Sequence, residues 1–204
     1  MTEEQTETVV PIDSIAEPQQ PMPAETIGQL VSLDAEFVAG DYVVLSDRFS
    51  GSESGFWVVG HALRGNGSSV AIALGWTGTA DAAASAIRIL EESPPPSPIE
   101  GRYLSSESPQ QSDFEAGQRS ALAVAELVNL WAQAPDGVYG GYVVLDAEVA
   151  GLERIDSPPP NNEVTLNVLN IFYAAEWVIF AGFAVFLWYR VVRDEWEDEN
   201  ATVE

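Results

Sequence analysis

The stretch VTLNVLNIFYAAEWVIFAGFAVFLWY, residues 164–189, decides the architecture of this chain. From Ile171 onward nearly every side chain is apolar. About twenty helical residues, at about 1.5 Å each, cross a hydrocarbon core of about 30 Å. The sequence therefore predicts a transmembrane helix over residues 164–190. The alternative is a buried helix of a soluble core, but no other segment could surround so long an apolar cylinder.

The flanks of this stretch indicate its orientation. Arg190 and Arg193 follow it, and the positive-inside rule places the end that carries arginine in the cytoplasm. We therefore expect an acidic cytoplasmic tail over residues 191–204, in a single-pass protein of the cell membrane whose bulk is extracytoplasmic. The N-terminus has neither the basic nor the apolar region of a conventional signal peptide.

Composition limits the partners and the chemistry. The 204 residues have a formal net charge of −24 and contain no lysine, which argues against nucleic acid because phosphate binding needs clustered cations. Such acidity is explained either by solubility and host composition or by a basic protein partner or cations near the membrane. The chain has no cysteine, which excludes disulfides, thiol catalysis and thiolate metal sites.

The rest of the chain reads as one domain between less regular segments. Residues 1–30 are rich in Glu, Thr, Pro and Gln and predict a disordered or extended N-terminal arm. Residues 31–157 predict a soluble α+β domain, and residues 158–163 a Pro-rich spacer. The expected fold is thus α+β: an antiparallel, β-rich extracytoplasmic domain with two helices, plus one C-terminal transmembrane helix.

Short β-prone runs and two helical patterns fill that domain. Strands are expected at 36–49, 55–63 and 68–76, with turns at Gly40-Asp41, 50–55 and 64–69, of which RGNG is a good hairpin signal. Thr79 should cap a helix over 80–92 that the following prolines stop. Further strands are expected at 99–105 and within 135–151, with Gly140-Gly141 as a bend or bulge. A second helix is expected at 114–133, with Ser112 and Glu115 as a capping box.

The sequence offers little catalytic chemistry. His61 is the one histidine, and it lies in a strand context typical of a surface or half-buried residue. No phosphate-binding loop opens a helix, and no calcium-binding spacing occurs. We therefore predict no catalytic, cofactor-binding or metal-binding residue and a protein that is not an enzyme.

Glu176 is the unusual residue of the apolar stretch. A carboxylate in hydrocarbon faces protein or water, as in a proton path or an interhelical hydrogen bond, or it reaches the outer interface about a turn away. The small residues Ala174, Ala181, Gly182 and Ala184 allow close approach of another helix. This combination indicates docking onto a larger membrane complex.

Two sets of residues resemble the Surfeit locus protein 1 family, assembly proteins of cytochrome c oxidase. The domain carries Gly40-Asp41-Tyr42, Arg48, the segment Gly55–Val59 and the segment Val70–Trp76, in the family's order. The apolar stretch carries Tyr173-Ala174-Ala175-Glu176-Trp177-Val178-Ile179-Phe180-Ala181 after Pro160-Asn161-Asn162, similar to the start of the family's last membrane helix.

The chain departs from the family pattern in three places. The family has an additional N-terminal membrane helix, for which residues 1–30 of this sequence offer no long apolar stretch. It has a histidine just before the Tyr-Ala pair, where this chain has Asn170, and an Asn-Arg pair where this chain has Ala73-Leu74. If that histidine handles haem in the family, its replacement favours an accessory subunit over a haem chaperone.

The resemblance implies a membrane-anchored accessory subunit or assembly factor of cytochrome c oxidase or of a respiratory supercomplex, without a cofactor of its own. The expected partners are subunits of the haem–copper oxidase, subunits of the cytochrome bc complex as a second candidate, and the lipid bilayer. The alternatives are a haem-handling chaperone, in which Tyr173, Trp177 and His61 hold the cofactor, and a generic membrane-tethered binding domain. The predicted site residues are the helix positions Asn170, Tyr173, Ala174, Glu176, Trp177, Phe180 and Ala181, and the domain positions Gly55, Phe56, Trp57, Gly75 and Trp76.

Overall fold

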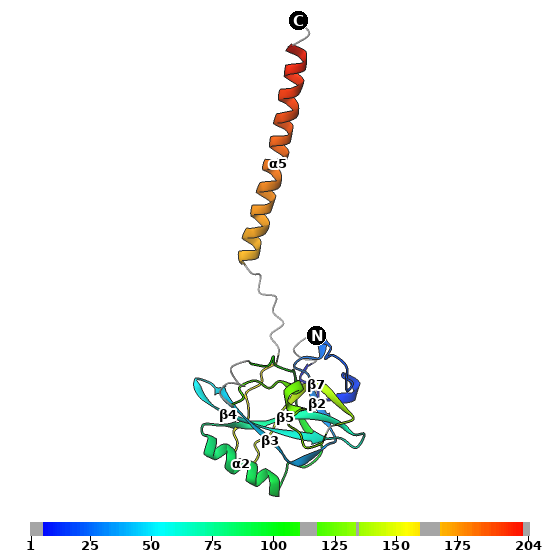
Figure 1. Ribbon diagram of the computed structural model, residues 1–204, viewed down its shortest axis with the longest axis vertical. Helices are drawn as coiled ribbons and strands as arrows, with labels where there is room; N and C mark the ends of the chain where they lie inside the picture. The colour runs from blue at the N-terminus through cyan, green and yellow to red at the C-terminus, as the bar shows by residue number, and fades with distance from the viewer. Residues whose placement is uncertain (1–5, 111–117, 134, 160–167, 202–204) are drawn as a thin grey trace. The chain divides into compact units, whose positions relative to one another are not determined.

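The computed structural model describes residues 6–110, 118–133, 135–159 and 168–201, in two units that we treat separately. Unit 1, residues 1–162, holds a folded domain, and unit 2, residues 163–204, holds one long helix (Figure 1). The strands run β1 Val10–Pro11, β2 Leu30–Leu33, β3 Glu36–Ser50, β4 Glu53–Leu63, β5 Ser68–Thr77, β6 Ile99–Ser105 and β7 Gly137–Leu145. The helices run α2 Ala80–Glu92, α4 Val124–Leu127 and α5 Val168–Ala201, with 3-10 turns η1 Ile12–Ser14 and η2 Ala24–Thr26.

The expected α+β class is confirmed, and the sheet is mixed. Among the described residues it has seven strands in the order β1-β2-β6-β7-β5-β4-β3. The pairs β1–β2 and β5–β7 are parallel and the other four are antiparallel. The predicted meander appears as β3–β4–β5, and the RGNG turn joins β4 to β5 through a hydrogen bond from Gly67 N–H to Arg64 O of 2.9 Å.

The chain connectivity requires the sheet to curl. β2 is the second strand and β3 the last, so they would lie about 24 Å apart in a flat sheet. Asp34 and Ala35 alone connect Leu33 to Glu36, and three peptide units span at most about 11 Å. The two ends of the sheet therefore approach each other, as in an open barrel. We call the gap at this connection the seam.

Each face of the curled sheet is covered. The inner face packs around Val31, Ile72, Tyr103 and Val143 and is closed by α2, whose Ala83, Ala86 and Leu90 are buried. The outer face carries a second core of Trp57, Trp76, Tyr142, Leu122, Leu127 and Trp131. Because both faces are covered, β5 is buried from Ser68 to Trp76.

Helix α2 begins and ends as its sequence predicts. The Thr79 hydroxyl accepts a hydrogen bond from Ala82 N–H at 3.2 Å, which is the expected N-cap. The last residue is Glu92, directly before Ser93 and the three prolines. Figure 1 shows α2 beside the strands of the sheet.

The predicted helix over residues 114–133 is wrong in extent. Its described part contains one helical turn, α4, and otherwise follows an irregular path. The reason is that side chains outside this segment accept hydrogen bonds from backbone N–H groups that a continuous helix would use internally. Leu122 N–H donates to Glu107 Oε2 at 2.9 Å, and Val124 N–H donates to Ser106 Oγ at 3.0 Å. Leu122, Leu127 and Trp131 are buried, whereas Leu130 is exposed. The predicted capping residues Ser112 and Glu115 lie outside the described residues.

The predicted arm packs onto the domain from residue 6 onward. Ile12 is fully buried in the inner core, and Arg64 binds the Asp13 carboxylate at 2.5 and 2.8 Å. Further along, Gln19 N–H donates to Val138 O at 2.8 Å, which fixes the Pro-rich part against β7. A few anchoring contacts hold this segment, so it shows no periodic apolar pattern in the sequence.

Gly40-Asp41 forms a bulge and not the predicted turn. Phe37 pairs with Ala62 and Tyr42 with Gly60, so residues 38–41 bulge opposite His61 within one continuous β3. Gly40 has a φ of 83°, which glycine adopts at little cost. The bulge turns the Asp41 side chain toward β4, as the next subsection describes. The Gly140-Gly141 irregularity is confirmed, because the β5–β7 register shifts between Val138 and Tyr142.

Candidate functional site

Helix α5 carries the first set of predicted site residues. Its segment Ile171–Asp194 is long and apolar enough to cross a membrane, with a mean hydropathy of 1.8, and none of it is buried. That exposure contradicts the alternative of a core helix. At about 100° per residue, the predicted positions fall within an arc of about 160°, which we call the docking face: Tyr173, Ala174, Glu176, Trp177, Phe180 and Ala181.

The docking face combines bulky aromatic residues with small ones. Trp177 is 73% exposed, and its ring meets Phe180 edge-on with centroids 6.4 Å apart. Glu176 lies at one border of this face, about 120° around the helix from position 170. Asn170 belongs to α5, but its side chain lies outside the described residues. Around the helix the three aromatic residues occupy the middle of this face, with the two alanines at one border and the Glu176 carboxylate at the other.

The second predicted set, in the domain, meets at one place on the sheet. Trp57 of β4 pairs directly with Trp76 of β5, and both indoles are buried in the outer core, while Phe56 packs against the inner core. The glycines make room for these contacts. A Cβ on Gly55 would lie 2.6 Å from Trp76 Cζ2, and one on Gly75 would lie 2.6 Å from Leu152 Cβ.

Arg48 and Glu107 complete this tryptophan cluster. The Arg48 guanidinium lies 3.7 Å from the centre of the Trp57 ring, and the Trp76 indole N–H donates to Arg48 O at 2.8 Å. The guanidinium also binds both Glu107 oxygens, at 2.8 and 2.7 Å. Burial raises the pKa of Glu107, but hydrogen bonds from Arg48 and from Leu122 N–H outweigh it and hold that pKa below its ordinary value. The cluster braces residues 118–133, which lie over the outer core and which we call the cover segment.

The prediction that His61 lies at the surface or is half-buried is wrong, because the structure buries its side chain. It is 1% exposed, and both ring nitrogens are engaged: Nδ1 lies 2.7 Å from Asp41 Oδ2, and Nε2 lies 2.7 Å from Ser69 Oγ. The Trp131 ring stacks on the imidazole with centroids 3.9 Å apart. Asp41 also accepts a hydrogen bond from Ala132 N–H at 3.0 Å. This network ties the cover segment to three strands.

The order Asp41–His61–Ser69 is that of a charge-relay triad, yet its burial prevents substrate access. Ser69 is 0% exposed and Asp41 is 5% exposed, so a substrate carbonyl cannot reach the hydroxyl in this conformation. His61 likewise presents no free nitrogen to an iron. Among the described residues, no group of three His, Asp or Glu side chains is placed to hold a metal ion.

Arg102 fixes the point where the chain leaves the domain. It is 6% exposed and donates to Ser157 O and to Gly28 O, each at 2.6 Å. Its second terminal nitrogen lies 2.9 Å from Glu7 Oε1. Arg102 therefore joins the N-terminal segment, the approach to β2 and the last residue before the spacer. A strand position gave no signal of this role, because the partners lie 55 to 95 residues away in sequence.

Comparisons with known proteins place these features in a family. The model of the SURF1 family matches residues 2–182, which covers the domain and the first part of α5. No curated protein matches the chain, and no solved structure matches it.

Proposed function

Because the chain belongs to the SURF1 family, the Surfeit locus protein 1 family, we propose that it is a membrane-anchored accessory subunit or assembly factor of cytochrome c oxidase. The family is associated with cytochrome c oxidase assembly, and the match over residues 2–182 is the observation that carries the proposal. A candidate membrane helix at the C-terminus fits an anchored protein.

The proposed mechanism is docking without catalysis. Helix α5 would lie in the bilayer with its docking face against a membrane helix of the oxidase, where small residues permit close packing. The domain would rest on the extracytoplasmic surface of the same complex, because the arginines that directly adjoin the span, Arg190 and Arg193, lie on its C-terminal side. Subunits of the cytochrome bc complex are the second candidate partner, within a respiratory supercomplex.

The buried polar groups support a scaffold role for the domain. Arg48, His61 and Arg102 each form hydrogen bonds that hold irregular segments to the sheet. A rigid domain on a fixed exit point suits a protein that positions itself on a larger complex. Its surface and its helix, and not a reaction, would carry the function.

Deletion of the gene tests the proposal. We expect membranes from the deletion strain to lose most of their oxidation of reduced cytochrome c, with a matched loss of assembled oxidase, and full-length protein to restore both. A chain that lacks residues 164–204 should fail to restore them. Normal oxidase content in the deletion strain would contradict the proposal.

A further inference from the structure

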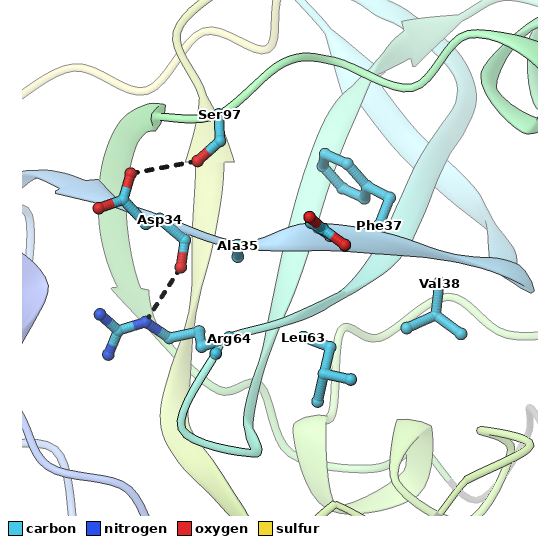
Figure 2. A pocket seen from close by; sticks show the side chains of 9 residues that line it. Asp34, Ala35, Phe37, Val38, Leu63, Arg64 and Ser97 are labelled. Atoms are coloured by element: carbon cyan, nitrogen blue, oxygen red, sulfur yellow. Dashed lines mark hydrogen bonds between the residues drawn. The ribbon is translucent and has the colours of Figure 1, made fainter.

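The seam of the curled sheet holds a pocket that no part of the proposed function uses. It has a volume of about 430 Å³ and lies between the β2–β3 connection, the β4–β5 turn and the loop that precedes β6. Figure 2 shows its lining side chains, which include Asp34, Phe37, Val38, Arg64 and Ser97. The pocket exists because the sheet curls without closing at this connection.

The walls of the seam pocket are apolar and its polar groups are mainly acidic. Ala35, Phe37, Val38 and Leu63 supply the hydrocarbon surface. Asp34 and Glu36 supply two carboxylates. The Asp34 carboxylate accepts a hydrogen bond from the neutral Ser97 hydroxyl at 3.2 Å, a contact that leaves its charge uncompensated (Figure 2).

The cation at the pocket does not neutralise these carboxylates. Arg64 lines the pocket, but its two terminal nitrogens bind the Asp13 carboxylate. Nη1 also donates to the Tyr139 hydroxyl, and Nε donates to the backbone of the pocket, at Asp34 O, over 3.5 Å. The charge of Arg64 is thus balanced by Asp13, and the pocket keeps the negative charge of Asp34 and Glu36.

We propose that the seam pocket receives a basic side chain, Arg or Lys, from a protein partner. Such a side chain has an aliphatic stem and a cationic head, which match apolar walls beside two carboxylates. The proposal rests on the proposed function in one respect, since it assumes that the domain meets another protein.

A second copy of this chain fits the pocket poorly. The chain carries a net charge of −24 and contains no lysine, so two copies repel each other. Four arginines of the domain are already paired with carboxylates of the same chain: Arg48, Arg64, Arg102 and Arg154. Charge complementarity therefore selects a different protein with an exposed basic segment.

Photo-crosslinking in cells tests the occupant directly. Val38 lies in the β3 bulge at the pocket, where p-benzoylphenylalanine replaces it in the full-length chain without breaking a strand pair. We expect a crosslink to a protein whose attached peptide contains Arg or Lys next to the attachment point. The same residue at Ile89, which is exposed on α2, is the control for mere proximity.

The second part of the experiment removes the negative charges of the two pocket carboxylates. The double variant Asp34→Asn/Glu36→Gln keeps shape and hydrogen-bonding atoms, and it should lower the Val38 crosslink yield about fivefold. The matched double variant Glu53→Gln/Glu92→Gln, at exposed positions, should change the yield by less than about twofold. Equal yields from the two double variants would overturn the inference.

The remaining outcomes separate this inference from the proposed function. If oxidase subunits co-isolate with the chain but Val38 forms no crosslink, the inference fails and the proposed function stands. If Val38 crosslinks to a basic peptide of a protein unrelated to the oxidase, the inference stands and the partner in the proposed function is wrong.

Discussion

At the scale of single residues, Glu107 shows how a few groups hold the outer face together. It accepts hydrogen bonds from Arg48 on β3, from Leu122 N–H in the cover segment and, at 3.4 Å, from the Tyr142 hydroxyl on β7. Burial raises the pKa of Tyr142 to about 12, so this hydroxyl stays a donor at neutral pH. Removing the carboxylate would release three elements at once.

We predict that Glu107→Gln destabilises the domain by about 2 kcal/mol at pH 7. The folded-state pKa of Glu107 is lowered from 4.5, so the unfolded chain takes up the proton first as pH falls. Its stabilisation is therefore complete above that value and is lost as pH falls through the lowered pKa. Denaturation of the full-length chain in mild detergent, followed by tryptophan fluorescence, measures this. If Glu107→Gln lowers the free energy of unfolding by the same amount in acid and at pH 7, the ionised Glu107 carboxylate is not the source of the stabilisation.

His61 gives the second prediction at this scale. His61→Ala removes a buried ring that contacts Trp131, Asp41 and Ser69. We expect the free energy of unfolding to fall by about 3 kcal/mol, because the change leaves a cavity and unpaired polar atoms. Ser69→Ala removes one hydrogen bond and should cost about 1 kcal/mol. The same denaturation assay compares them. If His61→Ala destabilises the domain less than Ser69→Ala does, the His61 network does not hold the cover segment.

At the scale of elements, helix α5 offers a matched pair of substitutions. Ala181 lies on the docking face, whereas Ala175 lies on the opposite side of the helix, about 180° from the middle of that face. Ala181→Leu should block close packing and reduce recovery of oxidase subunits with the tagged chain by about tenfold. Ala175→Leu should leave recovery unchanged. Equal losses from both variants would remove the argument for this face.

The elements also show what the sequence could and could not predict. Strands β3, β4, β5 and β6 and helix α2 were predictable because turn residues, alternation and the Thr79 cap act within a few residues of each other. The cover segment was not, since Ser106 and Glu107 compete for its backbone groups from outside its own pattern. Tertiary hydrogen bonds there override the local helical preference.

The candidate sites divide in the same way. The residues of the docking face were predicted from a motif resemblance within one helix, whose periodicity places them on one side, and their docking role stays a prediction. The pair of Trp57 and Trp76 was found through motifs in adjacent strands. By contrast, Asp41 lies twenty residues before His61, and the β3 bulge brings the two side chains into contact. The spacing of residues in the sequence does not predict that bulge. The seam pocket depends on the curl of the whole sheet, which no local pattern encodes.

At the scale of the whole molecule, the lack of cysteine makes orientation directly measurable. Ser52→Cys places one thiol in the exposed β3–β4 hairpin, and Ala201→Cys places one at the end of α5. A membrane-impermeant maleimide should label the first in intact cells and the second only after permeabilisation. The reverse pattern would place the domain in the cytoplasm and reject the extracytoplasmic docking that we propose.

The acidity of the molecule bears on its partners at the same scale. Four of the domain's arginines pair internally, so the carboxylates that remain dominate its surface. Surfaces of this kind favour basic partners and exclude polyanions. A cationic surface on the partner complex is the corresponding expectation.

Affinity purification of the tagged full-length chain in mild detergent tests the central claim most directly. We expect subunits of the haem–copper oxidase to co-isolate, and expect them to be lost when residues 164–190 are replaced by a polyleucine span of equal length. Failure to recover any oxidase or cytochrome bc subunit with the natural chain would contradict the claim that it belongs to this complex or to its assembly.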